Sequence, residues 1–156
     1  LNTYPKSFWI EDSHIQTMDH LAILDKKRKL LQKIISGEKT IESRWYKFKK
    51  TPYQQITAGD TIYFKDSGEP VNIKAKVSNV LFFDHLDENK IKSIITQYGE
   101  RIGISLSSVE RLIEKNFCTL IFLEKVERIQ PFNVNKQGYG MMAAWITLKN
   151  INKIKK

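Results

Sequence analysis

A helix that runs directly into a strand, with a glycine between them, is the pattern in residues 25–48 that most narrows the possible folds. Between residues 26 and 36 the apolar side chains recur at helical spacing and predict one buried stripe: Leu30, Leu31, Ile34 and Ile35. Asp25 precedes this run as a predicted N-cap, and Gly37 follows it as a predicted left-handed C′ residue. Alternation from Thr40 to Phe48 then predicts a strand.

Three ionic side chains lie close together in this turn and strand: Lys39, Glu42 and Arg44. Lys39 is predicted in the turn, while Glu42 and Arg44, two residues apart on a strand, are predicted to point to one face. Three such groups are not expected all to lie in a core. One interpretation is an exposed Glu42–Arg44 pair, worth well under about 1 kcal/mol, beside a solvated Lys39. The other is a site that holds a polar ligand, and spacing alone leaves both open.

The positive charge of the chain is unevenly placed. The formal net charge is +9 over 156 residues, and much of the excess lies between residues 26 and 50. Such an excess attracts polyanions, and nucleic acid is the commonest of these in the cytoplasm. Aromatic and basic residues are interleaved from Arg44 to Lys50, which suits stacking of bases beside phosphate contacts. The alternative is that Trp45 or Phe48 packs inward and the lysines only maintain solubility, as is expected of the C-terminal lysines.

The ionic residues also carry a resemblance to a known family. Four positions match the Gly-x-Lys-x-x-Glu-x-Arg signature of ASCH domains: Gly37, Lys39, Glu42 and Arg44. The stretch His20-Leu-Ala-Ile-Leu-Asp25 and the Gly59-Asp60 pair before the next predicted strand are similar to the same family. The resemblance covers residues 20 to about 80 and, more weakly, extends to about 129. It implies a β-barrel of the PUA-like group.

The predicted fold class is α+β, a PUA-like mixed β-barrel of about five to six strands with a helix before the motif strand and a helical insertion. Beyond the motif, the sequence predicts strands at 61–65, 71–83, 117–129 and 143–148. Helices are predicted at 87–98 and 105–115, Ser105 is the predicted N-cap of the second, and Pro131 is expected to end the strand that begins at Phe117. The predicted division of the chain is an N-terminal extension (1–19), one ASCH/PUA-like domain (20–150) and a basic C-terminal tail (151–156).

Charge and resemblance together predict a protein that binds RNA, or a nucleotide or nucleoside ligand, in a basic cleft around the motif. Arg44 is assigned to a phosphate or a base edge as a planar fork, and Lys39 acts as a compact charge. Glu42 either holds Arg44 or accepts hydrogen bonds from an exocyclic amine, and Trp45 or Tyr46 stacks a splayed base. The full set of predicted ligand-binding residues is Gly37, Lys39, Thr40, Glu42, Arg44, Trp45, Tyr46 and Lys47.

A small hydrolase is the alternative that the resemblance implies. Some small ASCH proteins resemble amidohydrolases that act on N4-acetylcytidine, and at least one other member of the family resembles a ribonuclease. In that case Lys39 and Glu42 are the predicted catalytic residues, working as a general acid–base pair. The amidohydrolases use a threonine three residues after the motif lysine, and here Glu42 occupies that position. Thr40 is out of register to replace it, and the distant glutamate of that group falls near Glu100. This departure argues against a threonine nucleophile.

Other classes of function find less support in the sequence. No apolar run approaches the roughly 20 residues of a membrane span, no signal-peptide core is found, and no membrane association is expected. Cys118, the only cysteine, lies in an apolar run, which predicts a buried side chain and a reducing, cytoplasmic location. No metal site and no cofactor is expected, since the three histidines lack zinc-site spacing.

Two points stay open at this stage. The basic helix at 26–36 could instead dock an acidic protein partner, in which case the ionic cluster would be dispensable. An N-terminal arm with Tyr4, Phe8 and Trp9 either covers the cleft or extends the core, and the oligomeric state is not predicted.

Overall fold

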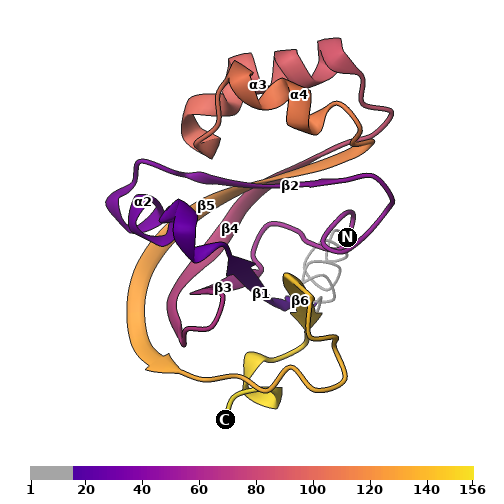
Figure 1. Ribbon diagram of the computed structural model, residues 1–156. Helices are drawn as coiled ribbons and strands as arrows, with labels where there is room; N and C mark the ends of the chain where they lie inside the picture. Colours follow the sequence, from indigo (N-terminus) through magenta and orange to yellow (C-terminus); the bar gives the residue numbers. More distant parts are fainter. Residues whose placement is uncertain (1–15) are drawn as a thin grey trace, which may run out of the picture.

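The computed structural model describes residues 16–156, so the N-terminal arm with Tyr4, Phe8 and Trp9 lies outside the described residues. Six strands form one curled sheet in the order β2-β5-β4-β3-β1-β6 (Figure 1). Their bounds are β1 Asp19–Leu24, β2 Ile41–Tyr46, β3 Thr61–Asp66, β4 Val71–Phe83, β5 Phe117–Phe132 and β6 Trp145–Leu148. Only β1 and β3 pair in parallel; the other neighbours are antiparallel. The prediction of an α+β fold with a mixed sheet is confirmed.

The sheet is a half-barrel rather than a closed barrel. Its terminal strands, β2 and β6, pair with β5 and β1 respectively and not with each other, which leaves a seam between them. Long β4 and β5 supply the curvature, because their register shifts at three places and Lys125 adopts a left-handed φ of 51° within β5. Bulges of this kind increase local twist and bend the strand. The seam that results is the setting of the candidate site.

Strand β5 runs farther than predicted and passes through Pro131 to Phe132. The expectation that Pro131 ends the strand was wrong. Strand β2 pairs only with the first part of β5, up to Phe122, so the later part has β4 as its one neighbour in the sheet. A proline is tolerated on such an edge because the missing N–H is not needed for a second ladder.

The helix before the motif strand is divided in two. A 3-10 turn η1 spans Lys26–Arg28, and α2 spans Leu30–Ser36, with Lys29 between them in a left-handed conformation. The prediction of one continuous helix from 26 to 36 was therefore wrong at its first turn. Its ends were right, because Asp25 accepts a hydrogen bond from the Lys27 N–H and Gly37 ends α2 with a φ of 83°. Three side chains of α2 enter the core: Leu30, Leu31 and Ile34.

The helical insertion lies between β4 and β5 and covers the sheet beside β2 (Figure 1). Helix α3 spans Glu88–Ile102, four residues beyond the predicted end. The predicted helix at 105–115 is shorter and broken, with η2 at Leu106–Ser108 and α4 at Val109–Leu112. Gly99 permits the chain to fold back after α3, since a Cβ there would lie 2.7 Å from the Ile104 carbonyl oxygen. The insertion and the strands enclose a second core that includes Cys118, which is buried as predicted.

The C-terminal residues are joined to the domain more closely than a tail would be. The 3-10 turn η3 spans Ile151–Lys153, and Ile151 and Ile154 are buried in a third core beside β1 and β6. The lysines of this segment are exposed, as expected. Among the described residues, no helix is both long enough and apolar enough to cross a membrane.

Candidate functional site

Lys39 is buried where the chain turns from α2 into β2. Its side chain is 3% exposed, and Nζ donates to the carbonyl oxygens of Ile41 at 2.8 Å and Ile102 at 2.7 Å. The third partner is Glu42 Oε1 at 3.1 Å. Three acceptors around one nitrogen require the ammonium form, because a neutral amine has only two protons to donate. Burial holds the pKa of Lys39 below its usual value, although the Glu42 carboxylate acts in the opposite direction.

Glu42 lies between two cations. One oxygen faces Lys39. The other accepts a hydrogen bond from Arg44 Nε at 2.9 Å and forms an ion pair with Arg44 Nη2 at 2.9 Å. Burial raises the pKa of Glu42, but Lys39 and Arg44 outweigh it, so the pKa lies below its usual value. The interpretation of an exposed pair beside a solvated lysine is wrong, since the Glu42 and Arg44 side chains are 4% and 12% exposed. We call Lys39, Glu42 and Arg44 the seam cluster.

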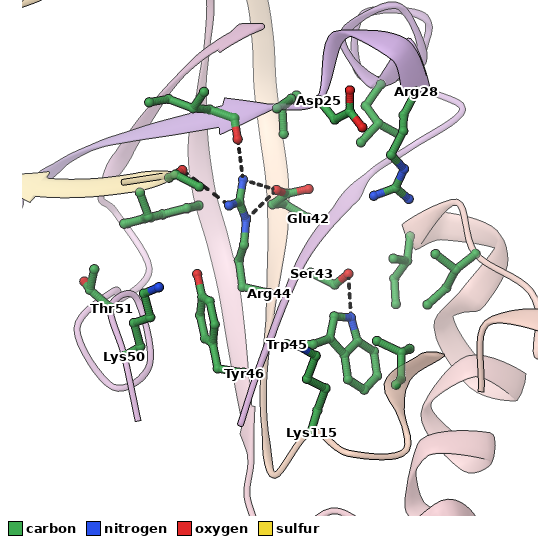
Figure 2. A pocket seen from close by; sticks show the side chains of 18 of the residues that line it. Asp25, Arg28, Glu42, Ser43, Arg44, Trp45, Tyr46, Lys50, Thr51 and Lys115 are labelled. Carbon is green, nitrogen blue, oxygen red and sulfur yellow. Dashed lines mark hydrogen bonds and ion pairs between the residues drawn. The ribbon is translucent and has the colours of Figure 1, made fainter. Parts of the chain in front are cut away.

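Arg44 spans the seam between the two ends of the sheet (Figure 2). From β2 it donates Nη1 to the carbonyl oxygen of Ala144 at 3.3 Å, just before β6, and Nη2 to that of Ile23 on β1 at 3.4 Å. The guanidinium also lies over the Trp145 ring, 5.1 Å from its centroid. A planar fork with several donors is suited to such bridging, whereas an ammonium group is not. Arg44 therefore joins edges that no backbone pairing joins.

A second buried polar group lies behind Trp145. His20 Nε2 is 2.8 Å from Asp60 Oδ2, and the two side chains are 0% and 1% exposed. The Trp145 indole N–H donates to His20 Nδ1 at 3.2 Å, which places the single ring proton of a neutral His20 on Nε2, toward Asp60. Asp60 also accepts from the backbone N–H groups of Met18 and Thr57. We call His20 and Asp60 the core pair; it fixes the wall on which Arg44 rests.

An open pocket of about 430 Å³ lies at the seam. Its walls come from the free edge of β2, the residues before β6, the loop after β2 and the region of α4 (Figure 2). Two of its lining side chains are acidic, Asp25 and Glu42, and six are basic: Arg28, Lys39, Arg44, Lys50, Arg111 and Lys115. Four of these six lie outside the seam cluster and form no ion pair with any carboxylate in residues 16–156. We call Arg28, Lys50, Arg111 and Lys115 the rim cations.

The architecture matches proteins of known structure, whereas no protein-family model and no curated protein matches the sequence. The ASCH protein of Zymomonas mobilis is 16% identical, with a TM-score of 0.63 over 88% of this chain and 96% of that one. A point mutant of that protein is 17% identical, with a TM-score of 0.63 over 86% and 93%. A DUF984 protein of Enterococcus faecalis V583 is 14% identical, with a TM-score of 0.51 over 80% and 93%.

The chain has an ASCH-domain fold. The predicted PUA-like architecture is confirmed, in the form of an open half-barrel of six strands. At this level of identity the likeness concerns the fold alone. What the pocket of this ASCH-domain fold binds has to be argued from its own residues.

The ASCH-domain fold brings five of the predicted site residues to the pocket: Lys39, Glu42, Arg44, Trp45 and Tyr46. Gly37, Thr40 and Lys47 are not among its lining residues. Gly37 ends α2, and Thr40 accepts a hydrogen bond from Arg101 Nε on α3. Phe48 is 73% exposed, so the alternative in which it packs inward is wrong, whereas Trp45 packs partly against the second core.

Several lining residues were not predicted as site residues, and most of them come from distant parts of the chain. Arg111 and Lys115 lie in and after α4, and Met142 and Trp145 precede or begin β6. No local pattern marks them, because the half-barrel alone brings α4 and β6 to β2. Arg28 and Lys50 belong to the basic excess of residues 26–50, but they lie outside the Gly-x-Lys-x-x-Glu-x-Arg motif. Within residues 16–156, no three His, Cys, Asp or Glu side chains gather as metal ligands would.

Proposed function

We propose that the pocket at the seam binds RNA, or a nucleotide-like ligand derived from it, through the rim cations. The observation that carries this proposal is the charge around the pocket. Arg28, Lys50, Arg111 and Lys115 line it without a carboxylate partner in the described chain, and Lys50, Arg28 and Arg111 are exposed. Cations so placed attract phosphate groups and release counterions on binding. A neutral or cationic small molecule needs no such rim.

Aromatic side chains beside the rim cations support a ligand with bases. Trp45, Tyr46 and Trp145 all line the pocket, and Lys50 Nζ lies 5.4 Å from the centroid of the Tyr46 ring. Aromatic faces stack nucleobases without regard to sequence, while neighbouring cations contact the backbone. A volume of about 430 Å³ lies within the range of small-ligand pockets, roughly 300–1,000 Å³. One base with its sugar is a reasonable occupant.

The seam cluster builds this pocket more than it contacts the ligand. Lys39 already donates to three acceptors, and both Glu42 oxygens face cations. Arg44, the most exposed of the three, borders the pocket directly. We therefore assign the phosphate contacts to the rim cations rather than to Lys39.

Salt dependence of RNA affinity tests the proposal. Fluorescence anisotropy with a labelled single-stranded 8-mer RNA, between 50 and 300 mM KCl, should show affinity falling steeply with salt. Lys115→Ala should reduce the slope of log affinity against log salt by about one, because one phosphate contact is lost. Lys153→Ala removes an equally positive side chain that does not line the pocket and serves as the matched control. Absence of binding at 50 mM KCl, or equal slopes for all three proteins, would contradict the proposal.

The hydrolase alternative stays a prediction that no contact of the seam cluster favours. For Lys39 or Glu42 to exchange a proton with a substrate, an existing contact would first have to break. We expect no acetate release from N4-acetylcytidine and no cleavage of the labelled RNA during the binding measurement. Acetate release or RNA cleavage that Glu42→Gln abolishes in a folded protein would favour the hydrolase instead.

A further inference from the structure

We infer that the pocket holds one nucleotide of a longer single strand, whose backbone crosses the free edge of β2 and is contacted on both sides of the pocket. This inference rests on the proposed function and narrows it from nucleotide-like ligands to single-stranded oligonucleotides. It follows from how the rim cations are distributed, not from their number.

The rim cations belong to two groups on opposite sides of the seam cluster. Figure 2 shows Arg28 and Lys115 on one side of Arg44, and Lys50 with Thr51 on the other. Arg111 lies in α4, four residues before Lys115, and belongs to the first group, which we call the helix side. The loop after β2 that carries Lys50 is the loop side.

Each side has more positive than negative charge. Asp25 lies beside Arg28 and offsets one of the three cations of the helix side (Figure 2). On the loop side, Lys50 is preceded by Lys47 and Lys49, which are exposed outside the pocket and extend the basic surface away from it. A ligand with one phosphate group can satisfy only one of the two sides. A chain that enters over one side and leaves over the other satisfies both.

Each side also has an aromatic ring. Trp45 and Tyr46 are consecutive residues of β2, so their side chains point to opposite faces of the strand. In Figure 2, Tyr46 lies toward Lys50, and Trp45 lies toward Lys115. The Trp45 indole is held by a hydrogen bond from Nε1 to Ser43 Oγ at 2.9 Å. Each side of the pocket thus has an aromatic ring with a cation beside it. Proteins that bind single-stranded nucleic acid use such pairs of ring and cation to stack successive bases.

The edge of β2 that faces away from β5 gives the oligonucleotide a path between the helix side and the loop side. Within residues 16–156, strand β2 pairs with β5 on one side only, and no described strand lies between it and β6 in the sheet order. The pocket of about 430 Å³ along this edge is open rather than enclosed and has room for about one nucleotide. Neighbouring nucleotides would therefore lie over the two sides, not within the pocket.

A length series combined with one variant for each side tests the inference. The probes are uridine 5′-monophosphate and pentauridylate, measured by calorimetry at 50 mM KCl with wild type, Lys50→Ala, Lys115→Ala and the Lys153→Ala control. Pentauridylate should bind at least about tenfold more tightly than the monophosphate, because a second base stacks and a second phosphate is contacted. Both Lys50→Ala and Lys115→Ala should weaken pentauridylate binding, and only one of them should weaken monophosphate binding.

The outcomes separate this inference from the proposed function. Equal affinity for the two probes, or loss of pentauridylate affinity in only one of the two variants, would overturn the inference and leave nucleotide binding standing. No binding of either probe would overturn the proposed function itself. All the substituted side chains are at the surface or half-buried and make no ion pair in the described residues, so the variants are expected to fold.

Discussion

The seam cluster and the core pair both consist of buried ionisable side chains, but the two groups have different structural roles. Lys39, Glu42 and Arg44 lie where the sheet is open, and Arg44 reaches across the gap to Ile23 and Ala144. His20 and Asp60 lie where the sheet is continuous and are sealed from solvent. The seam cluster replaces a missing strand pairing and forms the bottom of a pocket. The core pair holds one wall of that pocket in place.

Trp145 connects the two clusters. Its indole N–H donates to His20 Nδ1, and its ring supports the Arg44 guanidinium. The two clusters therefore share a side chain while differing in access to solvent. The charged motif is largely buried, and the contacts of Lys39 and Glu42 are already made within the protein. The ligand contacts are expected from the exposed rim cations, which belong to neither cluster.

The largest expected effect is the loss of Glu42, which pairs with two buried cations. Glu42→Gln should lower the free energy of unfolding by about 3–5 kcal/mol, because Lys39 and Arg44 would remain buried without a counter-charge. Urea unfolding followed by far-UV circular dichroism measures this. Glu38→Gln is the matched control, since Glu38 is 68% exposed and lies 3.9 Å from Lys33. A Glu42→Gln protein as stable as the control would show that the seam cluster does not hold the half-barrel together.

A smaller loss is expected when Asp60 is removed. Its carboxylate accepts from His20 Nε2 and from the backbone N–H groups of Met18 and Thr57. Asp60→Ala should cost about 2–3 kcal/mol in the same unfolding measurement, because those buried donors lose their acceptor. A cost above that of Glu42→Gln would reverse the ranking of the two clusters.

Arg44→Lys tests the role of the seam cluster more closely, because it keeps the positive charge and removes the planar guanidinium group. A lysine presents its donors from one nitrogen instead of three, so it is not expected to keep the contacts to Glu42, Ile23 and Ala144 that the three guanidinium nitrogens make. We therefore expect a loss of about 1–2 kcal/mol in the free energy of unfolding. The Trp145 environment should change with it, since the guanidinium lies over that ring. Tryptophan emission, recorded with Lys33→Arg as a conservative surface control, reports this change. An unaltered emission spectrum together with unaltered stability would show that Arg44 does not hold the two edges of the seam together.

The core pair should make stability depend on pH below neutrality. Burial lowers the pKa of His20 below its ordinary value of 6.5, although Asp60 and Asp19 act in the opposite direction. Below pH 6.5 the unfolded chain thus binds a proton that the folded chain does not, so stability falls as the pH decreases. We expect a slope of up to about 1.4 kcal/mol per pH unit as the pH falls below 6.5.

The pH window separates the core pair from the seam cluster. Glu42, whose pKa is lowered, contributes a loss only below its ordinary value of 4.5. His20→Gln should therefore flatten the stability profile just below pH 6.5 and leave the loss below pH 4.5 unchanged. A slope that persists in His20→Gln would assign it to another group.

Local patterns predicted much of the fold. Strand β4 begins and ends where its alternation predicts, and Asp87, Asp25 and Gly37 mark helix ends as expected. Errors arose where tertiary structure overrides local preference. Lys29 breaks the first helix, and Pro131 is accommodated because the later part of β5 has one neighbour in the sheet.

The candidate site was predicted in part, and the missing part has a physical reason. The motif identified Lys39, Glu42 and Arg44. It did not indicate that Lys39 is buried, because the Ile102 carbonyl to which Lys39 donates belongs to the end of α3. The helix-side residues Arg111 and Lys115 reach β2 only through the packing of the insertion. Such contacts depend on distant elements, so a single-sequence pattern does not reveal them.

The central claim is that rim cations, rather than the seam cluster, hold an anionic ligand. Its most direct test is the affinity of the fourfold variant Arg28→Ala, Lys50→Ala, Arg111→Ala and Lys115→Ala for a short single-stranded RNA. We expect this variant to unfold at the same urea concentration as wild type and to lose nearly all of its RNA affinity, with little remaining salt dependence. A folded variant that binds RNA as wild type does, with the same salt slope, would contradict the account.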